Sequence, residues 1–270
     1  MEDNNLKILR IRNLAQSLFI VLGVLLIQML CAMLWVAVAI LHNATDPDTR
    51  LMEMSVASAL LTILWCSLFY YQSDWRIFAY RRVCSVKTVV SILGLGMGGC
   101  IIVALVLSFL QTIFPAAFAQ YSKIMDQFGR GDLVITLLYT IGIVPVMEEM
   151  VFRGAVLDRL RLASYPFWTA NLIQAALFGI YHMNLIQGIY AFLWGILLGL
   201  IYQATGSILA DILAHMIFNT TNYLLMWLFP AGKAVSIPLY IGIFFLGIIF
   251  FVVGLCYTVQ AYRTRNSTKT

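Results

Sequence analysis

Two glutamates and an arginine interrupt an otherwise apolar stretch of the sequence, IVPVMEEMVFRG. Glu149 and Arg153 are four residues apart with the glutamate first, which is the favourable order for an ion pair on a helix. Glu148 is turned by about 100° from Glu149 and cannot share that partner equally. Pro145, three residues earlier, should loosen the backbone here. The spacing predicts one paired carboxylate and a second, differently directed one that could act as a base.

Two histidines lie in apolar runs further along the chain, His182 at the end of ALFGIYH and His215 in ADILAHMIFNT. Asp211, His215 and Asn219 follow one another at intervals of four, so a helix would carry them as one polar stripe. An imidazole could help to position a water molecule, and neutral donors could bind an oxyanion. The remaining histidine, His42, lies in a polar loop and is interpreted as solvated surface.

The composition predicts that these segments lie in a membrane. Hydrophobic residues make up 62% of the 270 residues and charged residues 11%, whereas soluble domains have roughly 25% charged residues. The net charge of +5 is explained by the location of the basic residues and does not imply a nucleic-acid partner. The five cysteines are scattered, with no CxxC pair, and are interpreted as small apolar residues.

Eight segments approach the roughly 20 apolar residues that a membrane-spanning helix needs. Turn residues separate them, and Ala116–Phe128 is too polar and short to span. The expected fold is an all-α, polytopic helix bundle that forms one integral-membrane domain over residues 1–270. The expected spans are Leu14–Leu41, Leu51–Tyr71, Val89–Phe114, Leu133–Leu157, Phe167–His182, Leu185–Tyr202, Ser207–Phe229 and Ile237–Tyr257.

The lysines and arginines favour a topology with both termini in the cytoplasm. With eight spans, twelve basic residues fall on the inner side and four on the outer side, as expected for a multi-pass protein of the cell membrane. The inner set is Lys7, Arg10, Arg12, Arg76, Arg81, Arg82, Lys87, Arg159, Arg161, Arg263, Arg265 and Lys269, and the outer set is Arg50, Lys123, Arg130 and Lys233.

The intramembrane polar residues have two interpretations. A charge near the bilayer centre costs at least ~2.5–3.5 kcal/mol, so such residues usually pair and usually function. Alternatively, they could be hydrogen-bonding groups that hold helices together. For a single buried histidine the structural interpretation is favoured. Two glutamates, two histidines, an arginine and an asparagine on three helices favour a functional site.

The same residues resemble the CAAX protease and bacteriocin-processing family, which includes the type II CAAX prenyl endopeptidases. The resemblance covers about Ile141–Tyr223, the motif-bearing core at residues 141–223. Its three motifs occur in the family's order: EExxxR at Glu148, Glu149 and Arg153, FxxxH at Phe178 and His182, and HxxxN at His215 and Asn219.

The resemblance implies an intramembrane endopeptidase in which Glu148, assisted by His182, activates water. His215 and Asn219 would stabilise the oxyanion, Arg153 would hold Glu149 in place, and Phe178 would be a supporting residue. The expected spans put His182 near the outer end of its helix and Glu148 deeper, which a short or tilted fifth helix would reconcile. No metal or other cofactor is expected.

Several alternatives remain open. The Glu/His cluster could be a zinc site, although HExxH is absent and Arg153 disfavours a cation. The protein could be a non-catalytic immunity or partner-binding protein, or a proton-coupled transporter. The expected partners are the lipid bilayer and a membrane-tethered peptide or protein, with no nucleic acid. A prenylated CAAX protein, a leader peptide and a signalling pre-peptide are all possible substrates.

Overall fold

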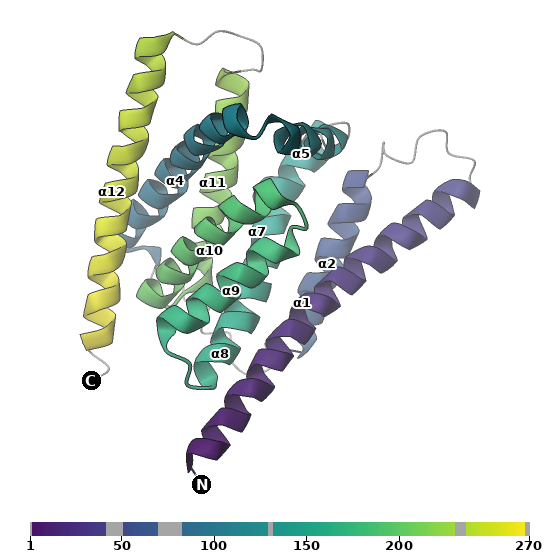
Figure 1. Cartoon of the computed structure of the whole chain (residues 1–270), viewed down its shortest axis with the longest axis vertical. Coiled ribbons are helices and arrows are strands. Elements are labelled where there is room, and N and C mark those ends of the chain that lie inside the picture. The colour runs from purple at the N-terminus through teal and green to yellow at the C-terminus, as the bar shows by residue number, and fades with distance from the viewer. Residues whose placement is uncertain (1, 42–50, 70–82, 129–131, 230–235, 268–270) are drawn as a thin grey trace. The chain divides into compact units, whose positions relative to one another are not determined.

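The computed structural model describes residues 2–41, 51–69, 83–128, 132–229 and 236–267, and every regular element in these ranges is a helix (Figure 1). The predicted all-α class is therefore confirmed. The helices are α1 (Glu2–Leu41), α2 (Leu51–Phe69), α4 (Val86–Ile113), α5 (Pro115–Phe128), α6 (Leu133–Leu137), η3 (Leu138–Ile143), α7 (Val144–Glu149), η4 (Met150–Leu157), α8 (Asp158–Leu162), α9 (Phe167–Tyr181), α10 (Leu185–Thr205), α11 (Ile208–Leu228) and α12 (Ile237–Ser267).

Some residues used in the sequence analysis lie outside the described ranges. They include His42 and turn residues within 43–48, 129–131 and 230–232. Basic residues of the topology argument also lie outside, namely Arg50, Arg76, Arg81, Arg82, Arg130, Lys233 and Lys269. The cytoplasmic location of both termini stays a prediction.

Six helical stretches of the described chain are long and apolar enough to cross a membrane, which makes this a multi-pass membrane protein. Two of the eight predicted spans lie outside this set. α9 has 15 residues, fewer than the roughly 20 that cross the hydrocarbon. α11 has 21 residues, but Asp211, His215 and two asparagines lower its hydropathy. The count of eight stays a prediction, and the two exceptions are the helices that position the two motif histidines.

The predicted fourth span is a continuous helical stretch, Leu133–Leu162, in which α-helical and π-helical segments alternate. In η3, the N–H of Val144 donates to the carbonyl oxygen of Tyr139, a π-helical i→i+5 bond. Pro145, which has no N–H, follows in the first turn of α7. A π-helical segment thus ends just before Pro145, where the sequence predicts a looser backbone. The two glutamates end α7 and Arg153 lies in η4, so the first motif spans the change of helix type.

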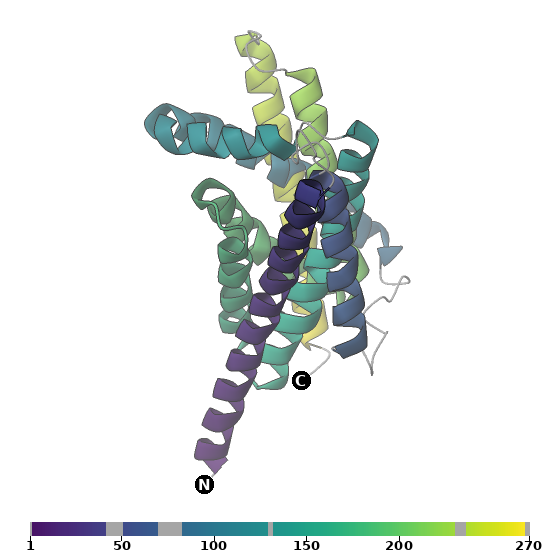
Figure 2. The same cartoon turned by 90° about the vertical axis from the view of Figure 1, so that its right-hand side faces the viewer.

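The chain divides into two compact units, and it passes from one to the other after residue 74, within α5 and within α10. Unit 1 comprises residues 1–74 and 119–195. In it, α1 packs against α2, α8 and α9 (Figures 1 and 2). The N-terminal part of α1 is held at the turn between α8 and α9, because Arg10 Nη2 donates to the carbonyl oxygen of Ser164 at 2.8 Å. Arg159 in α8 donates to Gln16 of α1 at 2.9 Å.

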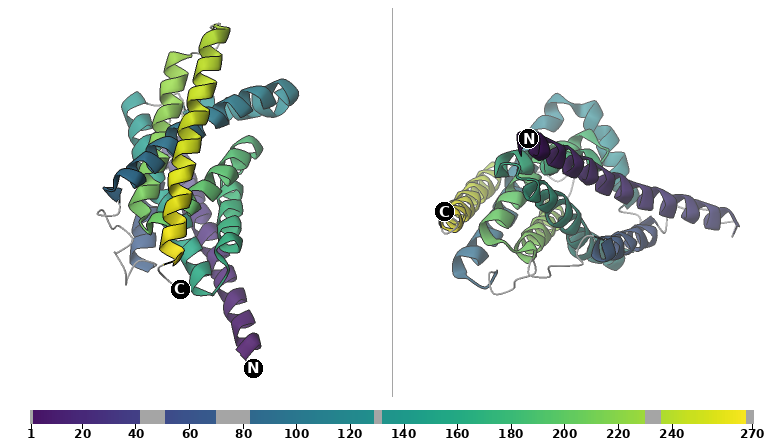
Figure 3. Two further views of the ribbon diagram at one scale, coloured as in Figure 1. Left: turned by 90° about the vertical axis from the view of Figure 1, so that its left-hand side faces the viewer. Right: turned by 90° about the horizontal axis from the view of Figure 1, so that it is seen from below.

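Unit 2 comprises residues 75–118 and 196–270, and in it α4 packs against both α11 and α12 (Figure 3). Three glycines permit this close packing. A Cβ atom on Gly94 or Gly98 would lie 2.5 or 2.4 Å from backbone atoms of α12, and one on Gly96 would lie 2.9 Å from the carbonyl oxygen of Ala214 in α11. Backbones approach this closely in membrane proteins where small residues line the contact. The expectation of one domain stays a prediction.

Candidate active site

Glu149 and Arg153 form a buried ion pair in unit 1. Arg153 Nη1 donates to Glu149 Oε1 at 3.0 Å, and both side chains are 0% exposed. The pairing predicted from their spacing is therefore confirmed. Burying two charges is costly unless further hydrogen bonds satisfy them. Arg153 makes one such further bond, from Nη2 to the carbonyl oxygen of Gly195 at 3.2 Å.

Phe178 connects this ion pair to the motif histidine of α9. The guanidinium carbon of Arg153 lies 4.8 Å from the centroid of the Phe178 ring, within the range of a cation–π contact. The ring also meets His182, edge to face, with centroids 4.9 Å apart. The carbonyl oxygen of Phe178 lies 2.8 Å from Nδ1 of His182. Phe178 thus contacts the second motif's histidine and the first motif's arginine.

The imidazole of His182 faces Glu148. A carbonyl oxygen can only accept a hydrogen bond, so Nδ1 of His182 carries hydrogen and Nε2 of the neutral ring is an acceptor. Nε2 lies 3.9 Å from Glu148 Oε1, and the two side chains are 11% and 6% exposed. At this distance the two acceptors are neighbours without a direct hydrogen bond. Glu148 is thus directed to a different group from Glu149, as its turn on the helix predicts.

The contact with Glu148 is made at the end of α9. The helix ends at Tyr181, His182 is its C-cap residue, and Met183 has a φ of 50° that stops the helix. α9 has 15 residues, so it is short, which is one of the two arrangements that the sequence analysis named; the depth of His182 stays a prediction. Asn184 then begins α10, because its side-chain oxygen accepts a hydrogen bond from the N–H of Gln187 at 3.0 Å.

The third motif lies on α11 in unit 2. Asp211 and His215 are 0% and 5% exposed, and Asn219 is half-buried. Their spacing on a helix that runs over Ile208–Leu228 puts all three on one face, as predicted. Gly96 of α4 lies close to Ala214 of α11, the residue directly before His215.

The structure brings Glu148, Glu149, Arg153, Phe178 and His182 together within unit 1. His215 and Asn219 belong to unit 2. That all seven predicted residues form one site stays a prediction.

Sequence reasoning missed several buried polar residues around this cluster. Gln174 is 0% exposed, and its Nε2 donates to Asn171 Oδ1 at 2.7 Å and to the carbonyl oxygen of Gly195 at 2.9 Å. That carbonyl also accepts from Arg153, so one α10 residue receives hydrogen bonds from α9 and η4. Tyr181 is hydrogen-bonded to Gln28 of α1. The signal that could have found these residues is an amide inside an apolar run.

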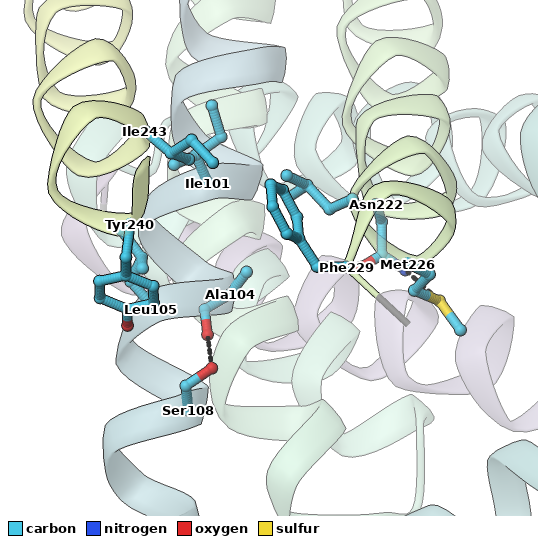
Figure 4. Close-up of a pocket in the computed structure, with 10 residues that line it drawn as sticks. Ile101, Ala104, Leu105, Ser108, Asn222, Met226, Phe229, Tyr240 and Ile243 are labelled. Atoms are coloured by element: carbon cyan, nitrogen blue, oxygen red, sulfur yellow. Dashed lines mark hydrogen bonds between the residues drawn. The ribbon is translucent and has the colours of Figure 1, made fainter. Parts of the chain in front are cut away.

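A cavity of about 370 Å³ lies elsewhere, in unit 2 between α4, α11 and α12 (Figure 4). Its walls are mainly apolar, and its polar side chains include Asn222 and Ser108. None of the predicted catalytic residues lines it. The candidate active site is therefore not this cavity.

The described residues contain no group of three or more His, Cys, Asp or Glu side chains arranged to hold a metal ion. The zinc site considered in the sequence analysis would need carboxylate and imidazole ligands. Glu148 and His182 are two such groups, and Glu149 is occupied by Arg153.

The motif-bearing segment is similar to a known protein family. Residues 130–221 match the family model described as type II CAAX prenyl endopeptidase Rce1-like. The segment is similar to this family. The match includes all three motifs, begins before the predicted core at residues 141–223, and confirms the resemblance derived from the motifs.

A curated relative supports the same assignment. Over 97 residues, the chain is 30% identical to a Bacillus subtilis (strain 168) protein named "Putative membrane peptidase YdiL". That alignment covers 36% of this chain and 38% of the relative, so the chain spans less than two fifths of the relative's length. No solved structure matches the chain.

Proposed function

We propose that the protein is an intramembrane endopeptidase in which Glu148 activates a water molecule to hydrolyse a peptide bond of a membrane-tethered substrate. The observation that carries this proposal is the buried contact between Glu148 and the acceptor nitrogen of His182, 3.9 Å apart. The family of the segment and the name of its bacterial relative support peptide hydrolysis as the reaction.

Two hydrogen-bond acceptors this close favour a shared donor between them. A water molecule has two hydrogens, and it can donate one to the carboxylate of Glu148 and the other to Nε2 of His182. Its lone pairs then point away from both groups, towards an incoming carbonyl carbon. The bond from Nδ1 of His182 to Phe178 holds the ring in the tautomer that this arrangement requires.

The reaction follows general acid–base chemistry. As the water oxygen bonds to the carbonyl carbon, Glu148 takes up one water proton and the carbonyl oxygen becomes an oxyanion. Collapse of the tetrahedral intermediate breaks the C–N bond, and Glu148 returns the proton to the leaving amine. Glu149 is paired with Arg153 and is not the base in this scheme.

His215 and Asn219 are the proposed oxyanion donors, because their spacing puts both side chains on one face of α11. Removing one such donor typically costs ~10²–10³ in kcat. We expect Asn219→Ala and His215→Ala each to lose turnover with little change in KM, and the double variant to be less than multiplicatively worse. Single-turnover cleavage and melting temperature on the same preparations measure this.

The matched control is Asn222→Ala, which removes an exposed amide from the same helix. It should retain full turnover. If His215 and Asn219 only hold helices together, their variants will instead melt at lower temperature and turn over normally in the folded fraction.

The proposed function is tested with the purified protein in liposomes and three quenched fluorescent peptides: a farnesylated CAAX peptide, its unprenylated counterpart and an apolar leader-type peptide. We expect cleavage of at least one peptide, and we expect it to survive exhaustive chelation because a carboxylate is the base. Loss of cleavage on chelation, restored by zinc, would establish the zinc alternative. Failure of the folded protein to cut any of the three would support the non-catalytic and transporter alternatives.

A further inference from the structure

An arginine of the last helix, Arg265, lies against the turn that joins α10 to α11. Its Nη1 donates to the carbonyl oxygens of Gln203 at 3.0 Å and of Tyr202 at 3.4 Å, near the end of α10. The last carbonyl groups of a helix have no partner within the helix and carry partial negative charge, so a guanidinium stabilises them. Arg265 lies outside the segment that matches the family, and it binds the end of α10 from a position 62 residues after Gln203.

The turn between α10 and α11 is shaped to admit the guanidinium. Gly206 has a φ of 63°, and its N–H donates to the carbonyl oxygen of Tyr202 at 2.7 Å. A Cβ atom on Gly206 would overlap the guanidinium of Arg265, so glycine suits both the backbone conformation and the contact. The N–H of Ser207 donates to Thr205 Oγ1 at 3.2 Å, and α11 begins at the next residue. Holding this turn therefore holds the start of the helix that carries the third motif.

The end of α12 should lie at a membrane surface. The stretch Ile237–Arg265 is long and apolar enough to cross the membrane. At its end Arg263 is exposed and Arg265 is half-buried, and a charged side chain in the hydrocarbon would be costly. Because Arg265 is bonded to the end of α10, that end should lie at the same surface.

The contact then determines the path of α11. Between Gln203 and Arg265 the described chain contains two complete helices, α11 and α12. If α12 crosses the membrane and both partners of the contact lie at one surface, α11 has to cross in the opposite direction. Its 21 residues are about 31 Å long, which matches a hydrocarbon layer about 30 Å thick. Hydropathy leaves α11 out of the six apolar stretches, so this crossing follows from the contact.

We propose that Arg265 is a positioning residue for the third motif, which anchors the start of α11 at the membrane surface and holds His215 and Asn219 on either side of the bilayer midplane. Counted from Ser207, His215 lies about 12 Å along the helix axis and Asn219 about 18 Å. The midplane lies about 15 Å from the edge of the hydrocarbon. The depth follows from the contact, whereas its importance for cleavage rests on the proposed function of His215 and Asn219.

Arg265→Met tests the anchor, and Arg263→Met is the matched control, because Arg263 is an exposed arginine near the same end of α12. A spin label at Thr220→Cys, an exposed position next to Asn219, reports the depth by power saturation in liposomes, with the native cysteines replaced by alanine. We expect Arg265→Met to move the label by between one residue and one turn of helix, about 1.5–5.4 Å. Arg263→Met should leave the depth unchanged. Arg265→Lys should restore it in part, since lysine keeps the charge.

Gly206→Ala tests the same contact from the other side. It places a methyl group where the guanidinium lies. It should move the label in the direction of Arg265→Met, and the double variant should move it little further, because both changes remove one contact. Fully additive shifts would overturn the shared contact.

Cleavage of the fluorescent peptides by the same preparations tests the link to the reaction. A displacement of about 1 Å can cost roughly 100-fold in rate, so we expect Arg265→Met to lower kcat by about 10- to 100-fold. KM should stay constant, because the oxyanion contact forms only in the transition state.

The label depth and the cleavage rate separate the possible failures. An unchanged depth in folded Arg265→Met would overturn this inference, even where the proposed function stands. A changed depth with wild-type kcat would overturn the positioning role. If the wild-type protein cuts no peptide, the proposed function fails and the label depth alone decides the anchor.

Discussion

Glu148→Gln is expected to abolish peptide cleavage and to leave a folded protein. Glutamine has nearly the same shape as glutamate, but it cannot take a proton from water, and general base catalysis contributes roughly 10²–10⁴ in rate. The buried ion pair between Glu149 and Arg153 does not involve Glu148, so its contribution to stability should remain. Cleavage of the fluorescent peptides in liposomes and the melting temperature in detergent measure the two effects separately.

The matched control is Glu53→Gln, which neutralises an exposed glutamate of α2 in the same unit. It should retain wild-type cleavage. Full activity of folded Glu148→Gln would show that a different group is the base. Loss of folding in that variant would show that Glu148 is needed for stability, contrary to the separate roles of the two glutamates.

Arg153→Met is expected to destabilise the protein by about 3–5 kcal/mol, because it leaves the carboxylate of Glu149 buried without its cation. Arg153 is also the donor to the carbonyl oxygen of Gly195 and contacts the ring of Phe178. Activity should fall along with stability, since the ring and carbonyl of Phe178 hold His182. Unfolding in mixed detergent, followed by helix content, measures the free energy of unfolding.

The double variant Glu149→Gln/Arg153→Met provides the key comparison. Removing both charges of a buried pair is often close to neutral, so much of the stability lost in the single variant should return. Arg159→Met is the control, because Arg159 donates to Gln16 in a half-buried position and should contribute at most about 1 kcal/mol. A double variant no more stable than Arg153→Met would mean that the guanidinium contributes through Gly195 and Phe178, and not through the charge pair.

The parts of the site that could be predicted from the sequence are those set by local geometry. The Glu149–Arg153 pair follows from a spacing of four on a helix, and the divergence of Glu148 follows from the rotation between neighbouring residues. The polar stripe of α11 follows from the same periodicity. The contact between Glu148 and His182 joins two helices, so spacing could not predict it. The family resemblance did.

Other features depend on backbone details or on long-range contacts that apolar periodicity does not encode. The sequence predicts ordinary helix for the π-helical segments η3 and η4, and Pro145 is the residue that indicates a departure from it. Gln28 and Tyr181 are 153 residues apart, and their hydrogen bond depends on how α1 packs against α9. A glutamine in the middle of the apolar run LGVLLIQMLC was nevertheless a visible signal, because an amide in hydrocarbon needs a partner.

The turn after α9 has a consequence for the supply of water. A helix of 15 residues is only about 22 Å long, so in a hydrocarbon layer about 30 Å thick it cannot reach from one surface to the other. The turn is suited to an apolar environment. Ile180, Met183 and Leu185 are apolar and exposed, and the N–H of Met183 donates to the carbonyl oxygen of Ile180 at 3.0 Å. A local thinning of the bilayer at this end of α9 would bring water to the imidazole of His182 without separating the helices. The thickness of the surrounding lipid should then determine how readily water reaches His182, and thin bilayers should favour the proposed peptide cleavage.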